Sequence, residues 1–308
     1  MTQVAADRIP ARADATTALG RFRNWIANPW AKARFLWVVA IGYSLWALLP
    51  VVIAVVYSFN SGRSQTSLQG LSMRWYLHDV SSVLQDVELR SSLLQSFKLT
   101  ILVVAISVPF GVAFALALDR WRGRGTGGAN FVMLFSFITP EVAIGVALFL
   151  FFGQLLTAIG PGFQAQVLGL SMFEMAYPVI IVRARLLSIG KEYEEAAMDL
   201  GASPMGALRR VLLPLLGPAI LASFAVVFAT AIDDFVIAQR LSTGQSTQTV
   251  PILIYASARR APLPSLNALA TITLIASTVI IALAFLVYRR STKRDRLGDQ
   301  ATDIVVPG

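Results

Sequence analysis

The hydrophobic residues of this chain fall in long blocks and are not spread evenly along it. Six blocks stand out, at residues 35–59, 94–118, 131–153, 164–182, 215–238 and 266–288. Each is close to the roughly 20 residues that an α-helix needs to cross the hydrocarbon core of a bilayer. A segment in that core must satisfy its own backbone polar groups, so helices are expected. The pattern predicts an all-α membrane protein with six transmembrane helices.

Composition agrees with lipid as the solvent. Hydrophobic residues make up 56% of the 308 positions and charged residues 14%, with a mean hydropathy of +0.66; a soluble domain usually has about 25% charged residues. A net charge of +9 could indicate a protein that binds nucleic acid. Because the basic residues flank the apolar blocks, we predict no nucleic-acid partner. With no cysteine and His78 as the single histidine, disulfides, histidine triads and multi-histidine metal sites are excluded.

The first 34 residues precede the first span and are rich in Ala and Thr. The apolar stretch that follows is too long for the core of a cleaved signal peptide. We therefore expect residues 1–34 to be a disordered tail; an amphipathic surface helix over residues 21–32 is the alternative. Residues 35–59 are the first transmembrane helix, and residues 289–308 form a C-terminal tail.

Lys and Arg counts give the orientation, because cytoplasmic loops of membrane proteins are enriched in both. With the N-terminus inside, the cytoplasmic segments hold 19 of the 26 basic residues and the segments on the other side hold six. The count predicts that both termini are cytoplasmic.

The connection between the fourth and fifth spans, residues 190–214, reads as two short helices joined by a turn. Glu192, Glu194 and Glu195 lie in the first turn of the first helix, where the helix dipole favours anions. Gly201 is placed to end this helix in a left-handed conformation. A ridge of small residues is left bare for a partner surface: Ala196, Ala197, Gly201 and Ala202.

The second helix has its own signals. Ser203 is placed as the N-cap and Pro204 as the first helical residue. Arg209 and Arg210 lie in its last turn, where cations suit the dipole. Pro214 is expected to break the helix before the fifth span. From physics alone, an ordinary amphipathic loop is also possible.

This connection resembles the signature of importer permeases of the ATP-binding-cassette (ABC) class. The signature is Glu-Ala-Ala, three residues, Gly, nine residues, Ile, one residue and Leu-Pro. The chain matches every spacing, with Val in place of Ile, at Glu195, Ala196, Ala197, Gly201, Val211, Leu213 and Pro214. The resemblance implies a type I importer permease fold over residues 92–288, with coupling helices at 190–214.

The resemblance also implies the partners. Such permeases work with two copies of an ATP-hydrolysing subunit, a second permease and an extracytoplasmic solute-binding protein, in the inner (plasma) membrane of a prokaryote. We expect the second permease to be a paralogue of this chain. The sequence has no G-x-x-x-x-G-K-[ST] phosphate-binding loop. We therefore expect no enzymatic activity and no cofactor in this chain, with ATP bound by the partner subunit.

Acidic residues inside apolar segments are costly and usually functional. Asp233 and Asp234 lie towards the outer end of the fifth block, and Glu141 follows Pro140 in the third. They are candidates for a substrate pathway that favours cations. The alternatives are that the aspartates only reach the interface and that Glu141 has a structural partner; for Glu174 the structural interpretation is favoured.

The surroundings of these residues, including 231–237, 243–244, 251–255 and 266–271, resemble the spermidine/putrescine branch of the permeases. A polyamine is therefore the expected substrate. Permeases for ferric iron, thiamine, phosphonates and opines are similar, so the identity of the solute stays open.

Two other classes of membrane protein fit the sequence less well. An intramembrane aspartyl protease needs carboxylates on facing helices about 3 Å apart, whereas Asp233 and Asp234 are neighbours in sequence. A secondary transporter often shows internal repeats. The two halves of this chain show no convincing repeat, and the cytoplasmic signature would be unexplained.

Overall fold

The computed structural model describes residues 34–64, 67–120, 138–259 and 263–303, together with isolated positions at 20, 123, 127–128, 131 and 135. For residues 34–35 and 291–303 only the backbone is described. The described chain is built of helices, with one isolated antiparallel β-bridge between Asn60 and Leu71. The tail predicted for residues 1–34 lies almost wholly outside the described residues.

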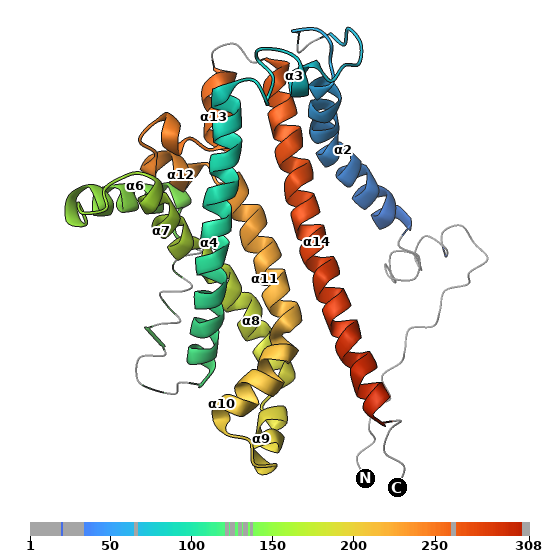
Figure 1. Cartoon of the computed structure of the whole chain (residues 1–308), viewed down its shortest axis with the longest axis vertical. Helices are drawn as coiled ribbons and strands as arrows, with labels where there is room; N and C mark the ends of the chain where they lie inside the picture. Colours follow the sequence, from blue (N-terminus) through green and yellow to red (C-terminus); the bar gives the residue numbers. More distant parts are fainter. Residues whose placement is uncertain are drawn as a thin grey trace. The chain divides into compact units, whose positions relative to one another are not determined.

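Contacts divide the chain into two units, residues 1–54 and 55–308. The first unit contains most of helix α2 (Arg34–Ser58), which continues through Pro50 (Figure 1). The side chains of α2 are exposed from residue 36 to residue 53, among them Trp37 at 67% and Trp46 at 70%. An apolar helix with this exposure suits contact with lipid, and its bounds confirm the first predicted block as a helix.

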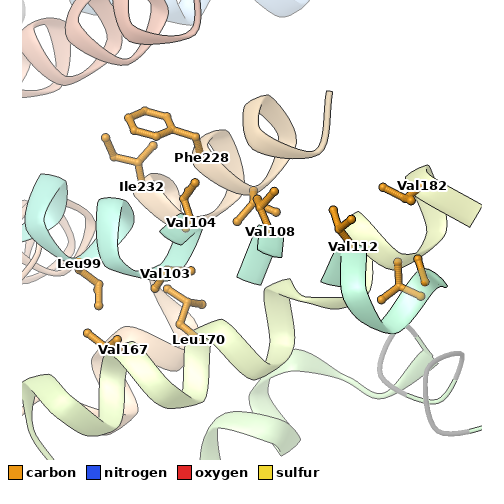
Figure 2. Packing of buried hydrophobic residues seen from close by; sticks show 14 of the residues in the cluster. Leu99, Val103, Val104, Val108, Val112, Val167, Leu170, Val182, Phe228 and Ile232 are labelled. Carbon is orange, nitrogen blue, oxygen red and sulfur yellow. The ribbon is translucent and has the colours of Figure 1, made fainter. Parts of the chain in front are cut away.

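Helix α4 (Val87–Arg120) is the centre of the second unit and packs against α7 (Phe163–Glu174), α8 (Ala176–Ile189) and α11 (Leu213–Asp233). It begins about two turns before the predicted block. Its buried residues recur at spacings of three and four, as one face of a helix requires. Figure 2 shows this face meeting α7, α8 and α11 through Leu99, Val103, Val104, Val108, Val112, Val167, Leu170, Val182, Phe228 and Ile232.

Small residues let these helices approach closely, as is common between helices in membranes. Gly111 of α4 faces the kink between α7 and α8: a Cβ at this position would lie 2.6 Å from Pro178 Cβ and 3.0 Å from the carbonyl oxygen of Met175. Ser107 Oγ donates a hydrogen bond to the Ser171 carbonyl at 3.0 Å. The interface between α4 and this kink is therefore closely fitted.

Five helices are long and apolar enough to cross a bilayer: Leu36–Ser58, Val87–Arg120, Phe163–Ile189, Pro204–Asp233 and Pro264–Arg290. The last belongs to α14 (Pro264–Asp303), which continues through most of the predicted C-terminal tail. The fourth span ends at Ile189, seven residues later than predicted, because α8 continues beyond the kink at Met175. These five correspond to five of the six predicted blocks.

The third predicted span, 131–153, is wrong as a single helix. After Pro140 (ψ 128°) the chain starts a new helix, α6 (Glu141–Leu150), which continues as a π-helical turn, η1 (Phe151–Leu155). These residues extend about 22 Å, less than the roughly 30 Å hydrocarbon core. The break follows from proline, whose missing N–H interrupts the hydrogen-bond ladder.

The fifth predicted span, 215–238, is also wrong as a single helix. Helix α11 ends at Asp233, Asp234 is extended (ψ 123°), and α12 (Val236–Leu241) starts in a new direction. A 3₁₀ turn, η3 (Gln245–Thr247), and another helix, α13 (Val250–Ala258), follow where the sequence suggested only a connection. Broken helices of this kind are tolerated in membranes only where protein buries them or where they line a water-filled cavity.

The segment between α2 and α4 folds around a tryptophan. Trp75, in the short helix α3 (Arg74–Leu77), is fully buried and donates from Nε1 to the Asn60 carbonyl at 2.6 Å. The backbone N–H of Ser81 and the side chain of Arg74 both bond to Asp79 and lower its pKa. The connection between α2 and α4 is therefore an ordered structure.

Candidate functional site

The first predicted coupling helix corresponds to α9 (Glu192–Asp199), and its first turn carries the three predicted glutamates. Gly201 has φ +87°, so the predicted left-handed end of this helix is confirmed. Gly190, which ends α8, has φ +75°. Both covalent connections of α9 thus run through glycines in conformations that other residues rarely adopt.

The helix predicted to follow α9 begins where the sequence placed it. Ser203 is the N-cap of α10 (Pro204–Ala207) and its Oγ accepts a hydrogen bond from Gly206 N at 3.1 Å, with Pro204 in the first turn. The predicted break at Pro214 is wrong. The chain continues through a π-helical turn, η2 (Leu208–Leu212), directly into α11. Pro214 comes shortly after this π-helical turn, and its missing N–H removes a hydrogen bond from the ladder without ending the helix.

The coupling segment presents apolar side chains at the surface. Leu200 is 91% exposed, and Tyr193, Met198 and Met205 are exposed beside the small residues of the signature. The signature residues Glu195, Ala196, Gly201 and Pro214 are exposed, while Ala197, Val211 and Leu213 are partly buried. Contiguous exposed apolar residues outside a membrane usually mark a protein interface.

Three carboxyl groups meet where helix ends converge. Glu141 at the start of α6 lies within hydrogen-bonding reach of Asp234, between α11 and α12, and close enough to Glu174 for electrostatic interaction. The Glu174 carboxylate is buried at the end of α7 and accepts a hydrogen bond from Thr230 Oγ1 at 2.6 Å. The sequence did not indicate this convergence, because the residues come from separate blocks.

The two aspartates have different surroundings. Asp234 is buried, and its Oδ1 accepts a hydrogen bond from Ala238 N, in the first turn of α12, at 2.8 Å. Asp233, at the last position of α11, is exposed. The side chains of Asp233 and Glu141, which is partly exposed, are therefore the more accessible of the predicted pathway residues.

Gln166 is a site residue that the sequence pattern did not reveal. It is fully buried in α7 and donates from Nε2 to the carbonyls of Ala238 at 2.8 Å and Thr247 at 3.0 Å. These hydrogen bonds satisfy two carbonyl groups that the breaks after α11 leave without helical partners. In an apolar setting such groups have no water to bond. Its polarity inside an apolar block was the available signal, but an uncharged amide drew no attention.

The membrane-length helices, the broken fifth span and the signature in residues 190–214 together match what is expected of an importer permease. Residues 107–296 match the family of binding-protein-dependent transport system inner membrane components. The chain belongs to this family and is the permease of an ABC importer, a multi-pass membrane component that is not itself an enzyme.

Two relatives in Escherichia coli (strain K12) are polyamine permeases. The putrescine transport system permease protein PotI is 31% identical over 274 residues, covering 87% of this chain and 94% of PotI. The spermidine/putrescine transport system permease protein PotC is 32% identical over 249 residues, covering 80% of this chain and 90% of PotC.

Solved structures share the fold. A chain of a bacterial ABC transporter involved in the import of the acidic polysaccharide alginate aligns with a TM-score of 0.66 at 15% identity, covering 88% of this chain and 98% of that one. A chain of the MetNI methionine ABC transporter aligns with a TM-score of 0.54 at 18% identity, covering 65% and 93%. These likenesses identify the type I importer permease fold.

Proposed function

We propose that this permease moves a small polyamine, such as putrescine or spermidine, across the inner membrane of a prokaryote. An extracytoplasmic binding protein delivers the solute, two copies of an ATP-hydrolysing subunit drive the cycle, and a paralogous second permease completes the pathway. The observation that carries the proposal is the similarity to PotI and PotC over most of both chains. A bacterial alginate ABC transporter with the same fold has been solved in complex with a pentasaccharide-bound periplasmic protein, which supports the general kind of partner.

The carboxyl groups support a cationic solute. Since one structural neighbour takes part in importing an acidic polysaccharide, the fold does not select the charge of the substrate, and side chains must do so. Asp233 and Glu141 offer accessible negative charge close to the buried Asp234 and Glu174. Carboxylates offset part of the cost of stripping water from a polycation in a low-dielectric cavity. A few such charges neutralise it without holding it tightly.

A transport assay tests the substrate. The complex, reconstituted in proteoliposomes with its binding protein, is expected to take up labelled putrescine or spermidine. Excess unlabelled polyamine should suppress this uptake, whereas ferric iron, thiamine, phosphonates and opines should not. Uptake suppressed by one of those four instead would reassign the solute within the same class of importer.

Replacing Asp233 tests the pathway. We expect Asp233→Asn to slow polyamine transport about tenfold at saturating loaded binding protein, the effect of losing roughly 1.4 kcal/mol of attraction for the cation. Because Asp233 is exposed at a helix end, the amount of complex in the membrane and its basal ATP hydrolysis should stay unchanged. The measurement is initial uptake rate per assembled complex.

Glu88→Gln is the matched control for Asp233→Asn. It removes an exposed carboxylate from the start of α4, outside the carboxyl cluster, and should leave transport unchanged. If Asp233→Asn and Glu141→Gln both transport at the normal rate, these residues do not line a cation pathway.

The coupling segment is the proposed docking site for the ATP-hydrolysing subunit. Its exposed Leu200, Met198 and Met205 offer an apolar surface, and Glu195 adds a charge at the N-terminus of α9. Figure 1 shows α9 and α10 at the same end of the second unit as the C-termini of α4 and α14, with α3 and α13 at the opposite end. This arrangement supports an orientation in which the coupling segment and the C-terminus lie on the same side of the membrane. The six crossings, with the N-terminus also in the cytoplasm, are part of our proposal.

Single cysteines test that topology, since the chain has none of its own. Lys191→Cys should react with an impermeant maleimide only after the membrane is opened, whereas Val80→Cys and Thr157→Cys should react in intact cells. All three positions are exposed. Thr157 is the decisive site because it follows the broken third segment. Protection of Thr157→Cys in intact cells would remove one crossing from the proposed topology.

A further inference from the structure

The coupling helix α9 is held to the bundle by more than its chain connections. Those connections pass through Gly190 and Gly201, both with positive φ. Glycine lets a joint change its dihedral angles at low steric cost, as hinges between moving elements require. The orientation of α9 relative to the spans therefore depends on side-chain contacts.

The contact at the start of α9 is an ion pair with α4. Arg120, in the last turn of α4, donates from its guanidinium to the carboxylate of Glu194 in the first turn of α9. The side chain of Glu194 is 6% exposed and that of Arg120 is 45% exposed. A second carboxylate, that of Asp119, places its Oδ2 3.6 Å from Arg120 Nε. Glu194 is thus the buried glutamate of this turn, while Glu192 and Glu195 are exposed.

A pair of this kind resists opening. Separating it removes the charged partner of a carboxylate that is 6% exposed, which is unfavourable until water reaches the group. The charge-assisted hydrogen bond also has a preferred direction and is stronger than a neutral one. When α9 is displaced, the end of α4 is therefore expected to follow it.

Helix α4 extends from this pair to the opposite end of the unit. Near the other end of α4, the Oγ of the buried Ser96 accepts a hydrogen bond from Val250 N. Val250 is the first residue of α13. Ser96 and Arg120 are about 36 Å apart along a continuous helix. Between them α4 packs against α7, α8 and α11, and both α7 and α11 lead to the carboxyl cluster.

We propose that Glu194 and Arg120 are positioning residues for energy coupling: their ion pair makes α4 move with the coupling helix, so that displacement of α9 by the ATP-hydrolysing subunit reaches the outer half of the permease. The proposal rests on the proposed docking role of α9. It assigns to Glu194, which is outside the Glu-Ala-Ala signature, a task distinct from contact with the partner. The pair faces the bundle, whereas Glu195 faces away from it towards the docking surface.

The test compares ATP hydrolysis with and without loaded binding protein in the complete reconstituted complex. Glu194→Gln and Arg120→Gln are each expected to reduce the stimulated increment about tenfold, at normal amounts of complex and normal basal hydrolysis. The double variant should lose about as much as either single one, because both substitutions break the same link. Glu88→Gln, an exposed glutamate in the first turn of α4 and outside the coupling segment, should behave as the wild type.

The outcomes separate this inference from the proposed function. A wild-type complex that binds no ATP-hydrolysing subunit, or shows no stimulation, would remove the proposed function and this inference together. Suppose that loaded binding protein stimulates ATP hydrolysis by the wild-type complex. Normal stimulation per complex in the single variants would then overturn the role of the ion pair and leave the proposed function standing. This holds even if the variants yield less complex. Losses that multiply in the double variant would also overturn it, since the two residues would then act independently.

Discussion

A Gly201→Val permease is expected to insert and assemble in normal amounts but to lose most substrate-stimulated ATP hydrolysis and transport. Gly201 has φ +87°, and an added Cβ would meet open space. The penalty is therefore conformational: an L-residue in the left-handed region costs roughly 1–2 kcal/mol, and a branched one more. To avoid it, the turn between α9 and α10 must change, and the exposed docking surface changes with it. Stimulated hydrolysis should fall by at least about fivefold, the factor that 1 kcal/mol represents.

Two companion variants assign the cause. Gly201→Asn adds a side chain that tolerates the left-handed region, so it should keep most of the coupled activity if backbone conformation is what matters. Ala202→Val adds bulk at the next residue, which does not have positive φ, and should have a smaller effect. Normal transport by Gly201→Val would mean that this turn does not position the coupling segment.

A Gly111→Ala permease is expected to be much less stable, although the change adds a single methyl group. The new Cβ would lie 2.6 Å from Pro178 Cβ and 3.0 Å from the Met175 carbonyl oxygen. A proline ring and a main-chain carbonyl cannot turn aside as a flexible side chain can, so α4 must move away from the kink between α7 and α8. Overpacking of this kind costs about 1–3 kcal/mol, and Gly111→Val should prevent accumulation of the folded permease.

Thermal unfolding of the detergent-purified permease measures the Gly111 effect. Gly153→Ala is the matched control, because a Cβ there has no atom within 4 Å. It should leave the unfolding temperature nearly unchanged, while Gly111→Ala lowers it clearly. Equal unfolding temperatures for the two variants would show that the contact between α4 and Pro178 is loose.

The spans that could be read from the sequence are those whose apolar runs are unbroken. Helices α2, α4 and α14 coincide with predicted blocks because the bilayer requires each segment to satisfy its own backbone, which makes length and apolarity sufficient signals. The caps of the coupling segment were predictable for a similar reason. Ser203 bonds three residues away and Gly201 acts through its own φ, so both effects are local.

The breaks in the third and fifth segments were harder to predict from the sequence. Pro140 was a visible signal, yet the length of the apolar block outweighed it. At Asp234 neither proline nor glycine marks the break. It is supported by the side chain of Asp234 itself and by Gln166, 72 residues from the Ala238 carbonyl that it binds. Such long-range hydrogen bonds leave no pattern in a window of neighbouring residues.

The sequence by itself determined the class of this protein: the apolar blocks require helices in lipid, and a local signature at fixed spacing marks the coupling segment. Which polar residues meet was decided only by the tertiary structure. Glu194 and Glu195 are chemically identical neighbours, and the position of the α4 terminus alone buries the first against Arg120 and leaves the second exposed. Likewise Glu141, Glu174 and Asp234 come together because helix ends converge there. Solvent preference acts on each segment separately, whereas charge pairing depends on where the packed helices end.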